Sequence, residues 1–343
     1  MKLEFFKRSA PEQALTIRET AARRGLQPVM VEKDFWVSWV LAVLFAHTEF
    51  GEQLVFKGGT SLSKVFGAIE RFSEDIDLSV SPEFVGISEE WVEQADSRNK
   101  RTARMKELEA ACVERVRDRF VPELERIAGE ALGERPGGAA WLEFQIDAHT
   151  DSPVVLFHYP SNEPTGFEYL GRLVKMEFGS LTDQKPVETH KIRPWVADEF
   201  PKQLEDFRCD AVVLELERTF WEKATILHAE HHRDPAQAMR DRLSRHYSDV
   251  AALARHANAD KALADHELRQ RVTNWKSRFF AATWSRYDLA KPGTFRLLPP
   301  ESRFAELERD YRAMRDMFLV EPPPFESLLE SLRGLEKRVN QIA

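Results

Sequence analysis

The chain has 343 residues, of which 43% are hydrophobic and 31% are charged. These values are ordinary for a folded globular protein, and they exclude a globally disordered or fibrous chain. The 49 Lys and Arg residues against 57 Asp and Glu residues give a net charge of −8. This balance excludes a surface coated in basic charge, although it leaves room for a local basic groove.

Two features of the sequence indicate a cytoplasmic protein with no membrane partner. Cys112 and Cys209 lie far apart and form no CxxC pair, which favours a reducing compartment over a disulfide framework or a zinc knuckle. The longest apolar run, residues 35–46, has 12 residues and is too short to span a bilayer. The N-terminus lacks the apolar core that a signal peptide needs.

The chain divides into segments of helical and of strand character. Helical spacing is found at residues 11–25, 30–47, 60–70 and 88–132, and again in most of the chain from about residue 199. Strand patterns are found at residues 54–56, 76–80, 140–148, 153–158, 170–178 and 187–192. Turn residues, among them Pro164 to Gly166, separate the middle strands. The last helix carries an apolar stripe from Phe325 to Val339 that must dock against another element.

This order of elements predicts an α+β protein with a mixed β-sheet and packed helices. We expect N-terminal helices at residues 1–50, a mixed-sheet domain at residues 51–197, and a mostly helical C-terminal domain at residues 198–343.

The sharpest feature is a glycine turn between a strand and a helix. Gly58 and Gly59 lack Cβ atoms where the backbone must approach another group closely, and a helix with Thr60 or Ser61 as its N-cap is expected to follow. The free N–H groups and the dipole of a helix start favour an anion, most often a phosphate.

Two carboxylates stand on the strand that comes next. Asp75 and Asp77 are two residues apart, so both point to one face, while Ile76 and Leu78 point into the core. Two like charges side by side are unfavourable unless a cation lies between them, and hard carboxylate oxygens suit Mg²⁺. Taken singly, the turn and the acid pair have ordinary structural explanations. Their combination at this spacing favours phosphoryl or nucleotidyl transfer.

Four strings in the chain resemble one protein family. They are EKDFW at residues 32–36, KGGTSL at 57–62, RFSEDID at 71–77 and ERTFWEK at 217–223. The glycine pair followed by Ser or Thr and then Asp-x-Asp resembles the DNA polymerase β-like nucleotidyltransferase superfamily, and the fuller strings are similar to the AbiEii/AbiGii-type nucleotidyltransferase toxins. The resemblance implies a nucleotidyltransferase-type sheet and a C-terminal domain that completes the active site.

The resemblance also implies roles for single residues. Asp75, Asp77, Lys223 and Asp249 are the expected catalytic residues, with Asp249 in an aromatic-x-Asp motif that resembles the family's last motif. Nucleotide binding is expected from Lys57, Gly58, Gly59, Thr60, Ser61 and Ser73. Without the resemblance, a surface lysine and a solvated helical aspartate would be the simpler interpretation of the pair at 223 and 249.

A third carboxylate on a neighbouring strand commonly completes such a metal site. Glu177 is the first candidate and Asp147 the second, and either is equally explained as a strand-edge acid in a salt bridge. The cofactor implied is Mg²⁺ or Mn²⁺, with an NTP as substrate.

The implied function is a toxin of an abortive-infection or toxin–antitoxin system, acting in phage defence. It would transfer NMP from an NTP to an RNA acceptor, the tRNA 3′ end being expected, and so block translation. A separately encoded antitoxin would be its partner. The alternative is a non-catalytic nucleotide- or protein-binding module on the same fold, such as an antitoxin or regulator.

Two further patterns have weaker claims to function. His228, His231 and His232 have helical spacing that suggests zinc, but HExxH is absent, and partners of the helix C-terminus are the favoured interpretation. Residues 98–106 carry five basic residues and no acid, which fits a polyanion-binding face and a solvated helix face equally well.

Overall fold

The computed structural model describes residues 2–88, 91, 94, 97–163, 171–280 and 282–341. The turn expected at Pro164 to Gly166 lies outside these residues. The chain forms two compact units: Met1–Val65 with Glu74–Val213, and Phe66–Ser73 with Leu214–Ala343. The expected boundaries at residues 50 and 197 stay predictions.

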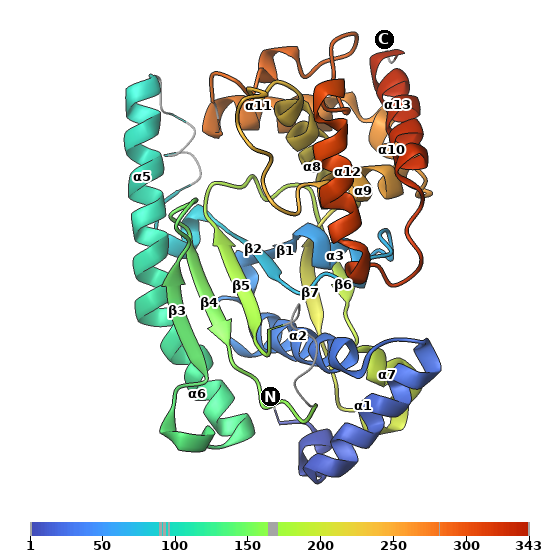
Figure 1. The fold of residues 1–343 in the computed structure, drawn as a ribbon. Helices are drawn as coiled ribbons and strands as arrows, with labels where there is room; N and C mark the ends of the chain where they lie inside the picture. Colours follow the sequence, from blue (N-terminus) through green and yellow to red (C-terminus); the bar gives the residue numbers. More distant parts are fainter. Residues whose placement is uncertain are drawn as a thin grey trace. The chain divides into compact units, whose positions relative to one another are not determined.

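The first unit contains the mixed sheet. Its strands are β1 (Leu54–Lys57), β2 (Ile76–Val80), β3 (Leu142–Ile146), β4 (Pro153–Phe157), β5 (Val174–Gly179), β6 (Val187–Lys191) and β7 (Asp210–Leu214). Their order across the sheet is β3-β4-β5-β2-β1-β7-β6. The pairs β1–β7 and β2–β5 are parallel, and β1–β2, β3–β4 and β4–β5 are antiparallel. Figure 1 shows this sheet with helices packed on it, as the sequence predicts.

The longer helices of the first unit fall within the predicted helical segments or within one residue or two of them. The helices of this unit are α1 (Ala10–Arg24), α2 (Pro28–His47), α3 (Gly58–Lys64), α5 (Arg98–Arg115), α6 (Val121–Leu132) and α7 (Trp195–Glu199), with a π-helical turn at Val116–Phe120 between α5 and α6. Helix α2 packs against α1 and β5, and its apolar side chains are buried as expected. Trp39 of α2 stacks on Phe157 of β4 with ring centroids 5.3 Å apart. This packing anchors α2 to the sheet.

Two predictions about local structure were wrong. The helix after the glycine turn begins at Gly58 with Lys57 as its N-cap and ends at Lys64, so Thr60 and Ser61 lie inside the helix rather than at its cap. The region after residue 199 also contains a strand, β7, which joins β1 through the pair Phe56 and Val213. Its apolar run has only four residues, 211–214, and so short a run is ambiguous between strand and helix until its partner is known.

The second unit is helical. It contains α8 (Leu216–His231), α9 (Ser244–Leu253), α10 (Ala259–Ala264), α11 (His266–Phe279), α12 (Phe304–Ala313) and α13 (Phe325–Gln341). The apolar stripe of α13 is buried, and α13 packs against α9, which answers where the stripe docks. Within the described parts of the chain, none of the helices is both long and apolar enough to cross a bilayer.

Short 3-10 turns connect these elements. They lie at Glu4–Lys7, Gly51–Gln53, Pro82–Val85, Pro136–Gly138, Pro201–Gln203, Tyr287–Leu289, Glu301–Arg303 and Arg315–Met317. The segment Phe66–Ser73 belongs to the second unit, where Arg71 forms a β-bridge with Phe318 and the Phe72 N–H donates to the Met317 carbonyl at 2.6 Å. The string at residues 71–77 therefore spans both units.

Candidate active site

The glycine turn and the acid strand meet in the first unit. Gly58 has a φ of +84°, a left-handed conformation that favours glycine. A Cβ at this position would lie 1.9 Å from the Asp77 carboxylate oxygen, so the Asp77 side chain would have to move to admit it. Glycine is therefore favoured here both by its left-handed φ and by the close approach of the Asp77 carboxylate.

The register of the sheet sets charged residues side by side. Lys57 of β1 is opposite Asp77 of β2, and Asp77 is opposite Glu177 of β5. Residues directly opposite each other on neighbouring strands point to the same face. Glu177, the first candidate for a third carboxylate, thus shares a row with Asp77, and the sheet order that brings β5 beside β2 cannot be read from the sequence alone.

Hydroxyl groups tie the start of α3 to its neighbours. The Thr60 hydroxyl donates to the Asp75 carbonyl at 2.5 Å, and the Ser61 hydroxyl donates to the Gly58 carbonyl at 3.0 Å. Both side chains are buried. These bonds hold the backbone before β2 against the glycine turn, which positions Asp75 next to the row of Asp77.

Lysines balance part of the negative charge on this face. Lys175 forms an ion pair with Glu177. Burial alone would lower the pKa of Lys175, but its hydrogen bond and charge contact with Glu177, together with the charges of Asp75 and Asp147, raise it overall. The Lys57 ammonium donates to the Thr182 hydroxyl at 3.1 Å. Lys175 therefore lies where a cation is favourable.

Asp147, the second candidate, has a structural task. Its carboxylate accepts from the backbone N–H groups of His149 and Thr150, both at 2.9 Å, and from the Thr150 hydroxyl at 3.0 Å. These bonds, the one from His149 first, lower the pKa of Asp147. They close the turn between β3 and β4, so Oδ1 of Asp147 already accepts three hydrogen bonds.

The donor set fits a hard divalent cation held by two carboxylates. Mg²⁺ usually keeps several waters and takes one or two carboxylates together with substrate phosphates, and the half-buried carboxylates of Asp75 and Asp77 supply such a pair. Among the residues that the structure describes, no group of three His, Cys, Asp or Glu side chains is arranged to hold a metal. Glu177 as a third ligand stays a prediction, because its carboxylate is paired with Lys175.

Two buried charged residues of α2, Lys33 and Asp34, brace the glycine turn. Asp34 pairs with Lys64, the last residue of α3, and accepts from the Trp195 N–H at 2.7 Å. Lys33 pairs with Glu74, the residue before Asp75. The sequence analysis gave these residues no role. The sequence could have revealed them, because residues 32–34 are three successive charges in a helix predicted to be buried, and buried charges must be paired.

Glu32 completes this polar network on the other side of α2. Its carboxylate accepts from the Ser161 hydroxyl at 2.6 Å and from the Asn162 N–H at 2.8 Å. Burial raises the pKa of Glu32 in spite of these bonds. The string at residues 32–36 is therefore structural in its contacts.

A second charged cluster lies in the second unit. The Lys223 ammonium of α8 is 2.8 Å from the Asp249 carboxylate of α9, so these residues are a buried ion pair and not a solvated lysine and aspartate. Arg71 donates to both oxygens of Asp249, at 2.7 and 2.8 Å. Although burial alone would raise the pKa of Asp249, the charges of Arg71 and Lys223 hold it well below its ordinary value.

Arg71 is the residue that sequence reasoning missed in this cluster. It is 3% exposed, although arginine is rarely buried without a partner. It lies 178 residues from Asp249 in the sequence, so no local pattern links them. The remaining signal was its place at the start of the string RFSEDID. Ser73 ends the same segment of the second unit.

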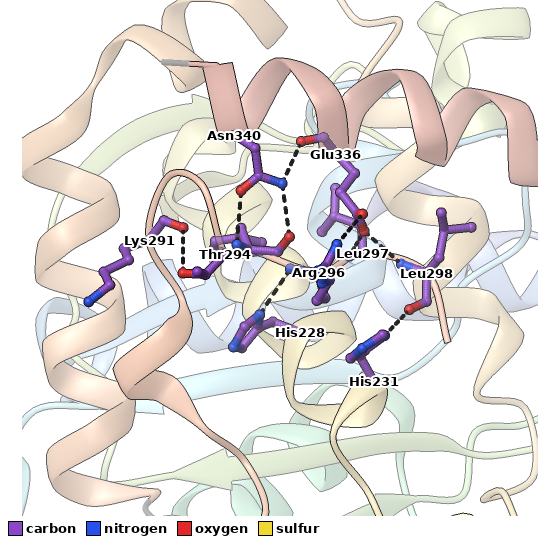
Figure 2. A network of polar contacts seen from close by, with 10 residues as sticks. His228, His231, Lys291, Thr294, Arg296, Leu297, Leu298, Glu336 and Asn340 are labelled. Atoms are coloured by element: carbon purple, nitrogen blue, oxygen red, sulfur yellow. Dashed lines mark hydrogen bonds and ion pairs between the residues drawn. The ribbon is translucent and has the colours of Figure 1, made fainter. Parts of the chain in front are cut away.

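The three histidines of α8 do not form a metal site within the described residues. Figure 2 shows that His228 and His231 instead bond a segment that follows α11. The His228 Nε2 donates to the Arg286 carbonyl at 2.9 Å, and its Nδ1 accepts from the Arg296 N–H at 3.0 Å. Burial lowers the pKa of His228 to about 4. Its ring is thus neutral, with the proton on Nε2.

Helix α13 holds the same segment from another direction. The Glu336 carboxylate accepts from the Leu297 N–H at 2.6 Å, and the Asn340 side chain bonds both the N–H and the carbonyl of Phe295, at 2.9 and 3.0 Å (Figure 2). The favoured interpretation of the histidines, as partners of their own helix end, was therefore incomplete. Their main contacts join α8 to residues 286–298.

Comparisons with known proteins address the family. A sequence model described as "Nucleotidyl transferase AbiEii toxin, Type IV TA system" matches residues 39–331. Among solved structures, MenT4, a nucleotidyltransferase toxin from Mycobacterium tuberculosis H37Rv, aligns with 96% of this chain and 90% of its own, with a TM-score of 0.45 and 16% identity. No curated protein matches the chain. The match of the family model covers most of the sequence and confirms the resemblance, so the chain belongs to the AbiEii nucleotidyltransferase toxin family of type IV toxin–antitoxin systems.

Proposed function

We propose that the chain transfers a nucleotide from an NTP to an RNA acceptor, with the tRNA 3′ end as the expected acceptor and a block of translation as the outcome. The observation that supports this proposal is the close approach of the Asp77 carboxylate to Gly58 at the glycine turn. Membership of a nucleotidyltransferase toxin family supports the same reaction class.

In this proposal Asp75 and Asp77 hold Mg²⁺ or Mn²⁺, and Glu177 is a further ligand if Lys175 releases it. A divalent cation bound there would neutralise the negative charge of the triphosphate. Lys57 and the backbone of residues 58–61 would bind phosphates, together with Ser73. The ammonium of Lys223 would offset phosphate charge, and Asp249 would fix its direction.

Charge supports the assignment of roles. The row of Asp77 brings two carboxylates side by side, whereas the cluster of the second unit has two cations on one carboxylate. An acidic face suits a metal and a cationic cluster suits phosphate oxygens. For the RNA acceptor, the basic residues of α5 offer support, because Lys100 and Lys106 are exposed and Arg101 is half-buried on this helix.

The test is transfer of label from each of the four NTPs to total tRNA, with and without Mg²⁺. Asp77→Asn should lower the rate by about 10³-fold, because it removes a metal ligand that no neighbour replaces. Glu188→Gln, an exposed acid on β6, is the matched control and should transfer normally. Full transfer by Asp77→Asn, or no metal-dependent transfer by the wild type, would contradict the proposal.

Growth after induced expression separates the toxin from a binding module. Asp75→Asn should relieve growth arrest if arrest depends on catalysis. Equal arrest by the wild type and by Asp75→Asn, at equal protein levels, would favour a non-catalytic module. The proposal also includes a cytoplasmic location and an antitoxin partner.

A further inference from the structure

A cavity of about 630 Å³ opens in the first unit, between the end of β6 and the start of β7. The Ile192 N–H donates to the Cys209 carbonyl at 2.9 Å, which fixes these two chain segments side by side. The volume lies within the range of small-molecule binding sites. None of the residues that line it belongs to the glycine turn, the row of Asp77 or the Arg71–Asp249–Lys223 cluster.

Its rim is cationic. Lys191, Arg193, Lys202 and Arg208 line the cavity and are exposed, against two carboxylates. In the part of the chain that the structure describes, none of these four side chains forms an ion pair. This excess of positive charge is notable in a chain with a net charge of −8. The rim therefore favours an anion with more than one negative charge.

The two arginines are held in place without losing their charge. A guanidinium N–H of Arg193 donates to the Ala197 carbonyl at 3.2 Å, and one of Arg208 donates to the Phe207 carbonyl at 2.8 Å. Carbonyl acceptors orient a guanidinium but do not neutralise it. A guanidinium has five N–H donors, so each arginine can also donate to a second acceptor such as a phosphate.

The cavity also has an apolar floor. Ile192, Leu204, Phe207 and Cys209 are each at most 5% exposed and line it from below the charged rim. Burial raises the pKa of the Cys209 thiol to about 12, so it stays protonated and is no nucleophile. The floor therefore offers binding to a flat apolar group rather than chemistry.

The register of the sheet separates this cavity from the glycine turn. Strands β1 and β7 run in the same direction with Phe56 opposite Val213, so the start of β7 at Asp210 lies level with the residue before β1. Gly58 follows the other end of β1. The two places are separated by about 15 Å along the strands, at about 3.3 Å per residue.

We propose that this cavity is a second site, which binds a phosphate-bearing nucleotide unit with the phosphate at the cationic rim and the base on the apolar floor. Inorganic phosphate or an acidic peptide would use the rim and leave the floor unused, whereas a nucleotide has both a multiply charged group and a flat apolar one. The unit is either a free nucleotide or one nucleotide of an RNA strand. The proposal goes beyond the transfer reaction and does not depend on it.

Binding to the full-length protein tests the proposal. AMP is titrated by calorimetry, and a fluorescein-labelled single-stranded RNA hexamer by anisotropy, both with EDTA present so that metal-dependent binding at the glycine turn does not contribute. The double variant Lys191→Glu/Lys202→Glu reverses two charges of the rim. Lys291→Glu/Lys337→Glu reverses two exposed lysines of the second unit and is the matched control.

The rim variant should weaken binding at least about tenfold relative to the control, because two phosphate-contacting cations become anions. Affinity for AMP as well as RNA identifies a free-nucleotide site, and affinity for RNA alone identifies an RNA site. Equal weakening in both double variants, or no binding of either ligand by the wild type, would overturn the proposal. Because all four substituted lysines are exposed, both double variants should keep the thermal unfolding temperature of the wild type. Label transfer is measured separately, so that failure of the transfer proposal is distinguished from failure of this one.

Discussion

The glycine turn of the first unit and the Arg71–Asp249–Lys223 cluster of the second differ in how deeply their carboxylates are buried and in which charges surround them. At the turn, Asp75 and Asp77 are half-buried and share their face with Glu177. In the cluster, one carboxylate accepts from two cations and all three side chains are almost fully buried. The first arrangement gathers carboxylates on a half-buried face, whereas the second surrounds one buried carboxylate with two cations.

This difference teaches which acids serve binding and which serve folding. A partly exposed acid beside other acids raises the energy of the folded chain until a cation arrives. A buried acid with two cationic partners stabilises the folded chain because removal leaves its partners uncompensated. Substitution of the same residue type at the two places should therefore have different consequences.

The strongest way to break the comparison is to remove each aspartate in turn. Asp249→Ala should lower the free energy of unfolding by about 3–5 kcal/mol, because Arg71 and Lys223 would stay buried without their carboxylate. Asp77→Asn should cost less, at most about 1 kcal/mol, because Asp77 is half-buried and asparagine keeps the size of its side chain. Urea unfolding of both variants measures this, and equal losses would show that the two sites do not differ.

Acid pH sharpens the comparison, because His228, a buried histidine of the second unit, changes its protonation on folding. The pKa of His228 falls from 6.5 to about 4 on folding. Between these values the unfolded chain binds a proton that the folded chain does not, so stability falls as pH falls from about 6.5 to about 4. The full loss is about 3 kcal/mol.

Unfolding free energies at pH 7 and at pH 4.5 test this expectation. His228→Gln should show a smaller loss over that interval than the wild type, since the titrating group is gone. His266→Gln, at an exposed histidine of α11, should behave as the wild type does. An identical pH dependence in all three proteins would refute a role for His228.

A glycine substitution probes how closely the turn is packed. Gly58→Ala should destabilise the chain by about 2–3 kcal/mol and abolish transfer, because it adds a clash with the Asp77 carboxylate to the cost of a left-handed φ. Gly67→Ala is the matched control: its φ is +57°, but nothing lies within 4 Å of an added Cβ. It should cost about 1 kcal/mol. Thermal unfolding of both variants isolates the clash.

The smallest expected effect separates charge from geometry in the cluster. Arg71→Lys keeps the positive charge but loses the two parallel bonds to Asp249, and should cost about 1–2 kcal/mol. Arg71→Ala should cost more, because Asp249 then keeps one cation only. If Arg71→Lys equals Arg71→Ala in urea unfolding, the paired geometry and not the charge determines the contribution of Arg71.

Much of the local structure could be predicted, because it depends on patterns within a few residues. The alternation at residues 75–80 predicted β2, and the apolar character of residues 30–47 predicted the buried helix α2. The start of α3 was misplaced because Gly58 and Gly59 were taken to form a turn before the helix. Strand β7 was missed because four apolar residues in a helical context do not identify their partner strand.

The sequence by itself determined most of the elements, the glycine pair and the acid pair, since each arises from residues that are neighbours in the chain. Only the tertiary structure decided that Glu177 lies beside Asp77, that Arg71 holds Asp249, and that α2 braces the turn through Lys33 and Asp34. Those contacts join residues separated by 30 to 178 positions. They depend on strand order and on which buried charges find partners, and both are settled only when the whole chain packs.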